Sequence, residues 1–423
     1  MNSRGLDMFG RPRVALTLGL GALIYFLVFV ASMQVRWRSL DFSAYYVWSR
    51  LLRSGINPYI TNGEPFARAW GMSILDRTNP AALLANYPPT FLLLFEPLTW
   101  LSPQSAHWIW TILNVIFLAL VLVMLDSDPA VTNWTRLSFI SLALLYLPIS
   151  LHFYWDQAQL LILLLLLAGL RSIQIGRDFA GGALIALACL LKLYPIVMLG
   201  YLFFWRRWRV MAYVAITLAF GALITVMLVG RDISVTFVPR LSSVNDLMGE
   251  LSVSGAVYHV LKFSGVPPGP FASIARQLLT AFADLAVVGL AIRATLLVSA
   301  DRVHEDRTFA LWLVAMLLIT PSSWSHYAVM LIPLFAEIGL AANEGAASRL
   351  AIGLAIASYL LADIVLLGLA GHELLERLLD VRFPVTRITG LFFAAGVLAF
   401  ASGYCLANQT ESKSKGCFMA VPP

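Results

Sequence analysis

The stretch that decides the fold is VALTLGLGALIYFLVFVASM, residues 14–33, in which no side chain is charged. A helix of this length crosses the hydrocarbon core of a bilayer, which is roughly 30 Å thick. The run is longer than the apolar part of a secretory signal peptide, roughly 7–15 residues, and SMQVRWR at its end lacks the small-residue pattern of a cleavage site. We therefore predict a membrane-spanning helix that the protein retains.

The rest of the chain has the same character. Of its 423 residues, 60% are hydrophobic and 12% are charged, whereas a soluble domain has roughly 45–50% and 25%. Comparable apolar runs recur, about twelve in all, and each is long enough to span a bilayer or nearly so. The sequence predicts an all-α integral membrane protein, a polytopic bundle of about twelve transmembrane helices that forms a single domain over residues 1–423.

Charge and cysteine content exclude several functions. The net charge is +6, but the arginines lie mostly between apolar runs, where membrane topology and anionic lipid account for them. Nucleic acid is therefore not an expected partner. The three cysteines form neither an even disulfide framework nor a CxxC motif, and we expect no metal site.

Lysines and arginines also predict the orientation. Those before the first run, in WRRWR at residues 205–209 and in the C-terminal tail put both chain ends in the cytoplasm. The two longest connections, residues 34–86 and 231–275, then face outward. The first outer loop carries six arginines, which the rule disfavours on that side and which calls for a functional explanation.

Two runs leave the number of crossings open. Residues 87–101 either cross the bilayer or dip into it and return. Residues 179–204 form either one span or two short helices broken at Pro195.

The first outer loop opens with RWRSLDFSAYYVWSRLLRSGINPY, residues 36–59. Its pattern predicts an amphipathic helix that lies flat at the outer membrane interface, with Asp41 or Ser43 as N-cap and Gly55 and Pro58 at its end. Asp41 is either a cap alone or an acid that also faces a functional site.

Polar interruptions of later apolar runs supply further candidates. NYPPT, residues 86–90, puts prolines in the first turn of a helix and Tyr87 at the interface. In HFYWDQAQ, residues 152–159, His152 and Asp156 are typical of an exposed turn, whereas Gln159 belongs to the next run and needs a partner inside the bundle.

Two interruptions point to chemistry. Lys192 in LLKLYP lies deep in an apolar run, where a lysine either reaches the interface with its long side chain or meets an anion. We favour the anion, a lipid phosphate. In TPSSWSHY, residues 320–327, His326 is expected on the same membrane face as Asp41, although a lone histidine is often just a satisfied polar residue.

The ordered set DF…YY…G…NPY, YPPT, QAQLL, KLYP and SWSHY, between about residues 36 and 333, resembles glycosyltransferase family 87. Members of this family are multi-spanning enzymes of the GT-C class that use polyprenyl-phosphate sugars, typically mannose. One departure is Ala158–Gln159, where the family pattern leads us to expect a Gly-Gln pair.

The resemblance implies roles for individual residues. Asp41 is the expected general base, and His326 is expected in the same catalytic site. Lys192 is the expected ligand of the donor phosphate. Apart from the resemblance, Arg38 of the first outer loop is expected to bind the phosphate with it, because the leaving group needs charge stabilisation. The side chains expected to line the substrate cleft are those of Tyr45, Tyr87, Gln159, Tyr194, Trp324 and Tyr327. No cofactor is expected, because the lipid-linked sugar is a co-substrate.

The expected function is therefore hexosyl transfer, mannose being the first candidate, from a polyprenyl-phosphate donor to an envelope glycolipid or glycan acceptor. A single displacement with inversion would occur at the outer face of a bacterial-type inner membrane. The alternative is a secondary transporter or lipid flippase, which is typically built from inverted repeats with charges near the bilayer midplane. A further alternative is an assembly protein without activity.

Overall fold

The computed structural model describes residues 12–33, 40–72, 74, 84–125, 132–244, 249–267, 269–298, 301–379 and 385–408, and all regular elements within them are helices. In chain order, with η for a 3-10 helix, they are α1 (Pro12–Met33), α2 (Leu40–Arg53), α3 (Glu64–Ala69), α4 (Pro89–Phe95), η4 (Glu96–Trp100), α5 (Pro103–Leu125), α6 (Asn133–Leu145), α7 (Leu147–Trp155), α8 (Gln159–Gln174), α9 (Asp178–Leu191), η5 (Tyr194–Val197), α10 (Met198–Phe204), α11 (Trp208–Val229), α12 (Arg231–Val244), α13 (Val253–Phe263), α14 (Pro270–Leu297), α15 (Arg302–Ile319), η6 (Ser325–Leu331), α16 (Ile332–Asn343), α17 (Arg349–Leu379) and α18 (Val385–Asn408).

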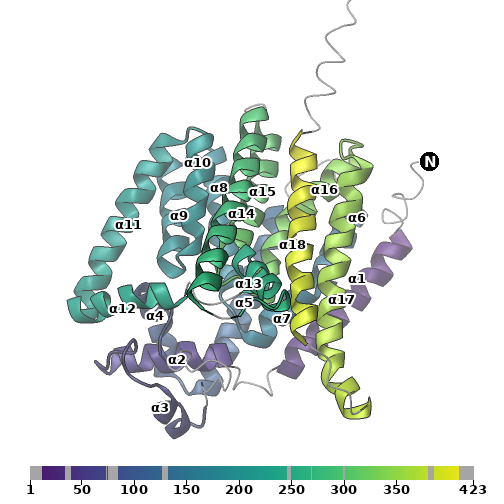
Figure 1. The fold of residues 1–423 in the computed structure, drawn as a ribbon. Coiled ribbons are helices and arrows are strands. Elements are labelled where there is room, and N and C mark those ends of the chain that lie inside the picture. The colour runs from purple at the N-terminus through teal and green to yellow at the C-terminus, as the bar shows by residue number, and fades with distance from the viewer. Residues whose placement is uncertain are drawn as a thin grey trace, which may run out of the picture.

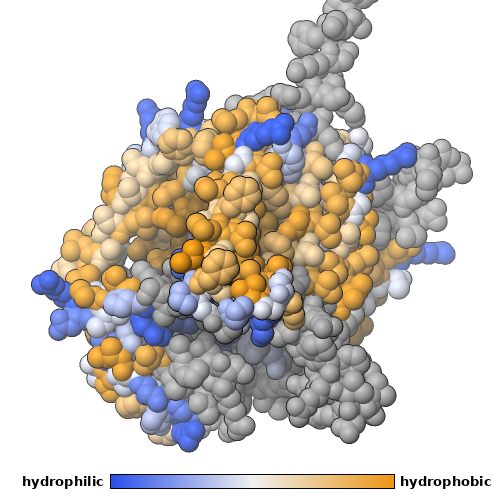
Figure 2. Space-filling view, in the orientation of Figure 1, coloured by the Kyte–Doolittle hydropathy of each residue, from blue (hydrophilic) through white to orange (hydrophobic). Residues whose placement is uncertain are grey.

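The long helices form a bundle with the surface of a membrane protein. Figure 1 shows α9, α15, α17 and α18 running roughly along one direction, while α2 lies across the bundle at one end. In Figure 2, hydrophobic side chains cover the middle of the visible face and hydrophilic ones gather toward its two ends. On α11, Phe220, Leu223 and Met227 are all more than half exposed, which is unfavourable in water and favourable in lipid.

The prediction of an all-helical integral membrane protein is confirmed. Among the described residues, six helices are long and apolar enough to cross a membrane, or seven if the bent pair α6 and α7 counts as one span. Three shorter apolar helices, residues 159–174, 178–191 and 194–204, accompany them. The count of about twelve spans stays a prediction.

Both runs whose number of crossings the sequence left open, residues 87–101 and 179–204, are interrupted. Residues 87–101 contain α4 and η4, of seven and five residues, which are too short to cross a bilayer at 1.5 Å per α-helical residue or about 2 Å per 3-10 residue. In the second run, α9 ends before Lys192, whose backbone is extended at φ −145° and ψ 136°, and η5 with Pro195 follows. The alternative of two short helices is therefore the correct one.

The helix predicted after the first span exists as α2, but two details of the prediction are wrong. The helix begins at Leu40, so Asp41 and Ser43 lie in its first turn and not at its N-cap. Residues 42–49 are all buried, because α2 packs against α4, η4, α5 and α7. The helix is thus part of the protein interior at one end of the bundle, although Gly55, at φ 72°, follows its end as expected.

The second predicted outer loop, residues 231–275, contains α12 and α13. Between them, the amide of Gly249 donates to the carbonyl of Pro321 over 2.8 Å, and that of Leu251 donates to Ser323 over 2.9 Å. A Cβ atom at position 249 would lie 2.3 Å from the Ser323 carbonyl oxygen, so only glycine fits this approach. These contacts attach the segment to the turn that leads into η6.

Candidate active site

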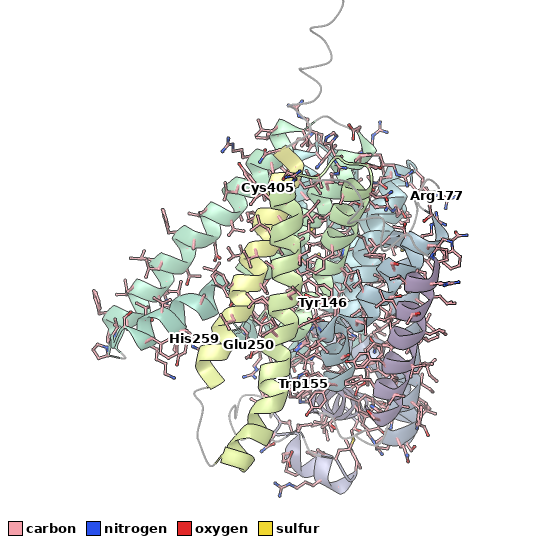
Figure 3. The ribbon with its side chains drawn as sticks, turned by 90° about the vertical axis from the view of Figure 1, so that its right-hand side faces the viewer. Tyr146, Trp155, Arg177, Glu250, His259 and Cys405 are labelled. Atoms are coloured by element: carbon pink, nitrogen blue, oxygen red, sulfur yellow. The ribbon has the colours of Figure 1, made fainter. Side chains whose placement is uncertain are left out.

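Five segments meet at the end of the bundle where α2 lies: the first turn of α2, residues 84–90, the turn between α7 and α8, the break after α9, and η6. Figure 3 gives the orientation, with Trp155, the last residue of α7, toward this end and Arg177 at the opposite end. The interactions described below join side chains from all five segments. The sequence prediction that these motifs share a site is consistent with this arrangement.

Asp41 is held by a glutamine that the sequence did not single out. Its Oδ2 atom accepts a hydrogen bond from Nε2 of Gln157. Oε1 of Gln157 accepts from the hydroxyls of Tyr45 and Tyr87, over 3.0 and 3.4 Å, and these two hydroxyl oxygens lie 2.7 Å apart. The only signal for Gln157 in the sequence was its place in the polar turn DQAQ.

The two tyrosines act as hydrogen-bond donors. Burial, and next the negative charge of Asp41, raises the pKa of the Tyr45 hydroxyl well above its ordinary value. Burial and then Tyr45 raise the pKa of Tyr87 in the same direction. Both hydroxyls therefore keep their protons at neutral pH, and Tyr45 and Tyr87 fix the orientation of the Gln157 amide.

Gln159 continues the network toward Lys192. Its Nε2 atom donates to Oε1 of Gln157 over 3.4 Å, and its Oε1 accepts from Nζ of Lys192 over 2.9 Å. Nζ also donates to the hydroxyl of Tyr327 over 3.0 Å. Gln159 is fully buried, and Lys192 is the partner that its position required.

Lys192 lies among aromatic rings. It is 5% exposed, and its Nζ lies 4.7 Å from the ring centre of Tyr87 and 4.6 Å from that of Tyr327. Tyr194 packs on Tyr327 with 5.6 Å between ring centres. The alternative in which Lys192 extends to the surface is therefore wrong, and its side-chain nitrogen is buried with aromatic and amide contacts.

His326 and Trp324 border this cluster. The ring of His326 lies 4.9 Å from that of Tyr327, whose hydroxyl binds Lys192. Trp324 precedes η6, and its carbonyl accepts from the amide of Tyr327 over 2.9 Å. The contacts described connect His326 to Asp41 through Tyr327, Lys192 and the two glutamines.

The NPY motif, residues 57–59, holds the backbone of Tyr87 in place. Oδ1 of Asn57 accepts from the amide of Tyr59 over 3.0 Å, and its Nδ2 donates to Thr236 of α12 over 2.9 Å. The hydroxyl of Tyr59 donates to the carbonyl of Tyr87 over 2.8 Å. This motif therefore supports the site and does not line it.

Arg38, predicted as a ligand of the donor phosphate, lies outside the described residues. In the described part of the chain, no group of three or more His, Cys, Asp or Glu side chains is arranged to hold a metal ion. The chemistry that the cluster offers is a carboxylate able to accept a proton and, across two amides, a cation able to bind an anion.

Comparison with known proteins identifies the family. A profile of glycosyltransferase family 87 matches residues 86–321, more than half of the chain. The match includes Tyr87, Gln157, Gln159 and Lys192, while Asp41 lies before it.

Two relatives are both named polyprenol-phosphate-mannose-dependent alpha-(1-2)-phosphatidylinositol mannoside mannosyltransferase. The one from Mycolicibacterium smegmatis is 28% identical over 271 residues, which cover 59% of this chain and 60% of that protein. The one from Mycobacterium tuberculosis is 26% identical over 350 residues, which cover 78% of this chain and 79% of that protein. The chain thus spans less than two thirds of the first relative and about four fifths of the second.

Among solved structures, ArnT from Cupriavidus metallidurans in the apo state aligns with 95% of this chain and 79% of its own, at 16% identity and a TM-score of 0.40. The family assignment rests on the sequence profile. The chain belongs to glycosyltransferase family 87.

Proposed function

We propose that the protein transfers a hexose, with mannose as the first candidate, from a polyprenyl-phosphate donor to a glycolipid or glycan acceptor. The family supports glycosyl transfer, and the names of the two relatives support polyprenol-phosphate-mannose as donor and a phosphatidylinositol mannoside as the first acceptor to try.

The observation that carries the proposal is the environment of Lys192. Its described hydrogen bonds are to neutral groups, Gln159 and Tyr327, although it is buried. A buried cation is costly unless an anion compensates it. A lipid-linked phosphate supplies that anion, and it would approach Lys192 from the bilayer.

Asp41 is the proposed general base. It takes the proton from an acceptor hydroxyl while that oxygen attacks the anomeric carbon of the donor sugar. A base of this kind contributes roughly 10²–10⁴-fold to the rate. Gln157 holds the carboxylate in one orientation by its hydrogen bond.

Lys192, with Arg38, is proposed to stabilise the leaving group. As the bond between the anomeric carbon and the phosphate oxygen breaks, its electron pair passes to the polyprenyl phosphate, where a fixed cation is most effective. In the cluster formed by Asp41, Gln157, Gln159, Lys192 and Tyr327, Asp41 is the one carboxylate. This favours a single displacement with inversion, because a double displacement needs a separate nucleophile. His326 is proposed to orient the acceptor or to bind the phosphate.

The outer face of an inner membrane is proposed as the location of the site, with both termini in the cytoplasm. Cysteines introduced beside Asp41 and His326 should both react with an impermeant thiol reagent added to intact cells. A cysteine beside Arg177, at the opposite end of the bundle, is the matched control and should stay unlabelled. Labelling of only one of the two site positions would contradict a shared outer site.

The proposal is tested with the purified full-length protein in lipid nanodiscs, given polyprenyl-phosphate mannose labelled in the sugar and a phosphatidylinositol mannoside. Label should move to the acceptor while free polyprenyl phosphate accumulates. Polyprenyl-phosphate glucose and arabinose, used in parallel, report the choice of sugar. A flippase would instead move intact donor across a vesicle bilayer, and periodate added outside would detect the sugar that has crossed. Donor that crosses the bilayer uncleaved would contradict the proposal.

A further inference from the structure

Behind the site lies a buried pair that the sequence did not identify. Nε2 of His107, in α5, lies 2.9 Å from Oδ2 of Asp156, and the two side chains are 1% and 4% exposed. The sequence predicted that Asp156 and His152 form an exposed turn, but both residues are buried. Since a pair buried this deeply is costly to desolvate, its position relative to the site is informative.

One end of the pair fixes the turn that carries both glutamines. Asp156 has φ 52° and ψ 47°, a left-handed conformation that is uncommon for residues other than glycine, asparagine and aspartate. Its carboxylate is bound by His107, and its carbonyl accepts from Nε1 of Trp110 over 2.8 Å. His107 and Trp110 are three residues apart on α5 and so lie on the same helix face. Gln157 follows directly.

The other side of His107 contacts the helix that carries Asp41. Its ring packs edge-on against Phe42, with 5.0 Å between centres and 75° between planes. Phe42 is fully buried and follows Asp41 directly. One imidazole therefore touches the residue after Asp41 and the residue before Gln157, the two partners of the hydrogen bond in the site.

We propose that His107 and Asp156 are positioning residues, which hold Asp41 and Gln157 in the register that the transfer reaction needs. The inference rests on the function proposed above and extends it. Neither side chain is proposed to touch the substrate. Loss of either side chain should therefore lower kcat and leave the KM for the donor within about twofold. A base displaced by about 1 Å costs on the order of 10²-fold in rate.

Three variants of Asp156 separate the effect of its side-chain bond to His107 from the effect of its left-handed backbone conformation. Asparagine tolerates the left-handed conformation and keeps an oxygen that accepts from His107, so D156N should retain activity. D156G keeps the conformation without strain but loses the bond, and its kcat should fall about ten- to a hundredfold. D156A loses the bond and also strains the turn. Wild-type kcat in D156G would overturn the proposal.

The matched change on the other partner is H107F, which keeps a ring against Phe42 and removes the bond to Asp156. Its kcat should fall like that of D156G, again with unchanged KM. A rise in KM with unchanged kcat would mean that the pair acts on substrate binding, and would overturn the positioning role.

A measurement without substrate makes the outcome independent of the proposed function. Thermal unfolding of wild type, Q157A, H107F and the double variant forms a double-mutant cycle. If His107 positions Gln157, the hydrogen bond from Gln157 to Asp41 is already weakened in H107F, and Q157A should lower the Tm less there than in wild type. Equal decreases would overturn the proposal. If the wild type cleaves no donor, the proposed function is contradicted, and the double-mutant cycle still decides the role of the pair. If H107F does not fold, the comparison of D156G with D156N takes its place.

Discussion

Gln157 and Gln159 bind opposite charges from one turn: Gln157 donates to the carboxylate of Asp41, and Gln159 accepts from the ammonium of Lys192. The two amides also bind each other over 3.4 Å. The two amides thereby stand between the carboxylate of Asp41 and the nitrogen of Lys192 and keep them apart. A direct ion pair would neutralise both, whereas this arrangement leaves Asp41 able to take a proton and Lys192 able to bind an anion.

A carboxylate in place of Gln157 tests this separation. Q157E puts a like charge beside Asp41, which disfavours the ionised base and raises its pKa. The acidic limb of the plot of kcat against pH should therefore move to higher pH, and kcat at neutral pH should fall. Q104E, at an exposed position near the start of α5, is the control and should leave the limb in place. An unshifted limb would mean that Asp41 is not the titrating base.

Replacement of Lys192 tests the anion site. K192M removes the charge but keeps the length, so binding of polyprenyl phosphate should weaken about ten- to a hundredfold, the usual strength of a hydrogen bond to a charged group. Thermal stability in the absence of ligand should not fall, because methionine needs no counter-ion in an apolar site. K262M, at an exposed position on α13, is the control. Unchanged affinity in K192M would remove Lys192 from the donor site.

The support that Tyr59 gives Tyr87 is tested by Y59F. The change removes the hydrogen bond to the Tyr87 carbonyl and should lower the free energy of unfolding by about 0.5–1.5 kcal/mol. A modest fall in kcat should accompany it, because Tyr87 contacts both Tyr45 and Lys192. Y258F, at a partly exposed position on α13, should change neither quantity. Equal effects of the two substitutions would contradict a specific role.

Glu250 makes stability depend on pH. Burial raises the pKa of its carboxyl above the ordinary value of 4.5, although hydrogen bonds from Ser325 act in the opposite direction. The folded state therefore holds this proton more tightly than the unfolded state, and its contribution to stability is complete below about pH 4.5 and is lost as the pH rises through the raised pKa. Thermal unfolding from pH 4 upward should show this decline in wild type, and E250Q should reduce it. D232N, which removes an exposed carboxylate at the start of α12, should keep the wild-type slope.

Residues that interrupt an apolar pattern could be predicted from the sequence. Lys192 and Tyr327 stand out there because a charge or a polar motif within an apolar run is costly unless it has a purpose, and Asp41 stands out as the acid of the arginine-rich loop after the first run. The recurring apolar runs were enough to predict the fold class, and five motifs in the order typical of one family were enough to predict the family.

The partners of these residues could not be predicted, because packing between distant segments determines them. Gln157 binds Asp41 from 116 residues away, and His107 lies 49 residues from Asp156. The burial of α2 was missed for a similar reason, since its amphipathic pattern fits a membrane interface as well as a site covered by η4 and α5. The left-handed conformation of Asp156, directly before Gln157, could not be predicted either, because aspartate adopts it only where the surrounding packing holds it.

The measurement that tests the central claim most directly compares wild type with D41N in nanodiscs, following both binding and cleavage of short-chain polyprenyl-phosphate mannose. D41N should bind the donor with unchanged affinity and turn it over about 10²–10⁴-fold more slowly. D232N, at an exposed position at the start of α12, should match wild type in both. Wild-type turnover by D41N would contradict the assignment of Asp41 as the base, and the reaction would then need another group to accept the proton.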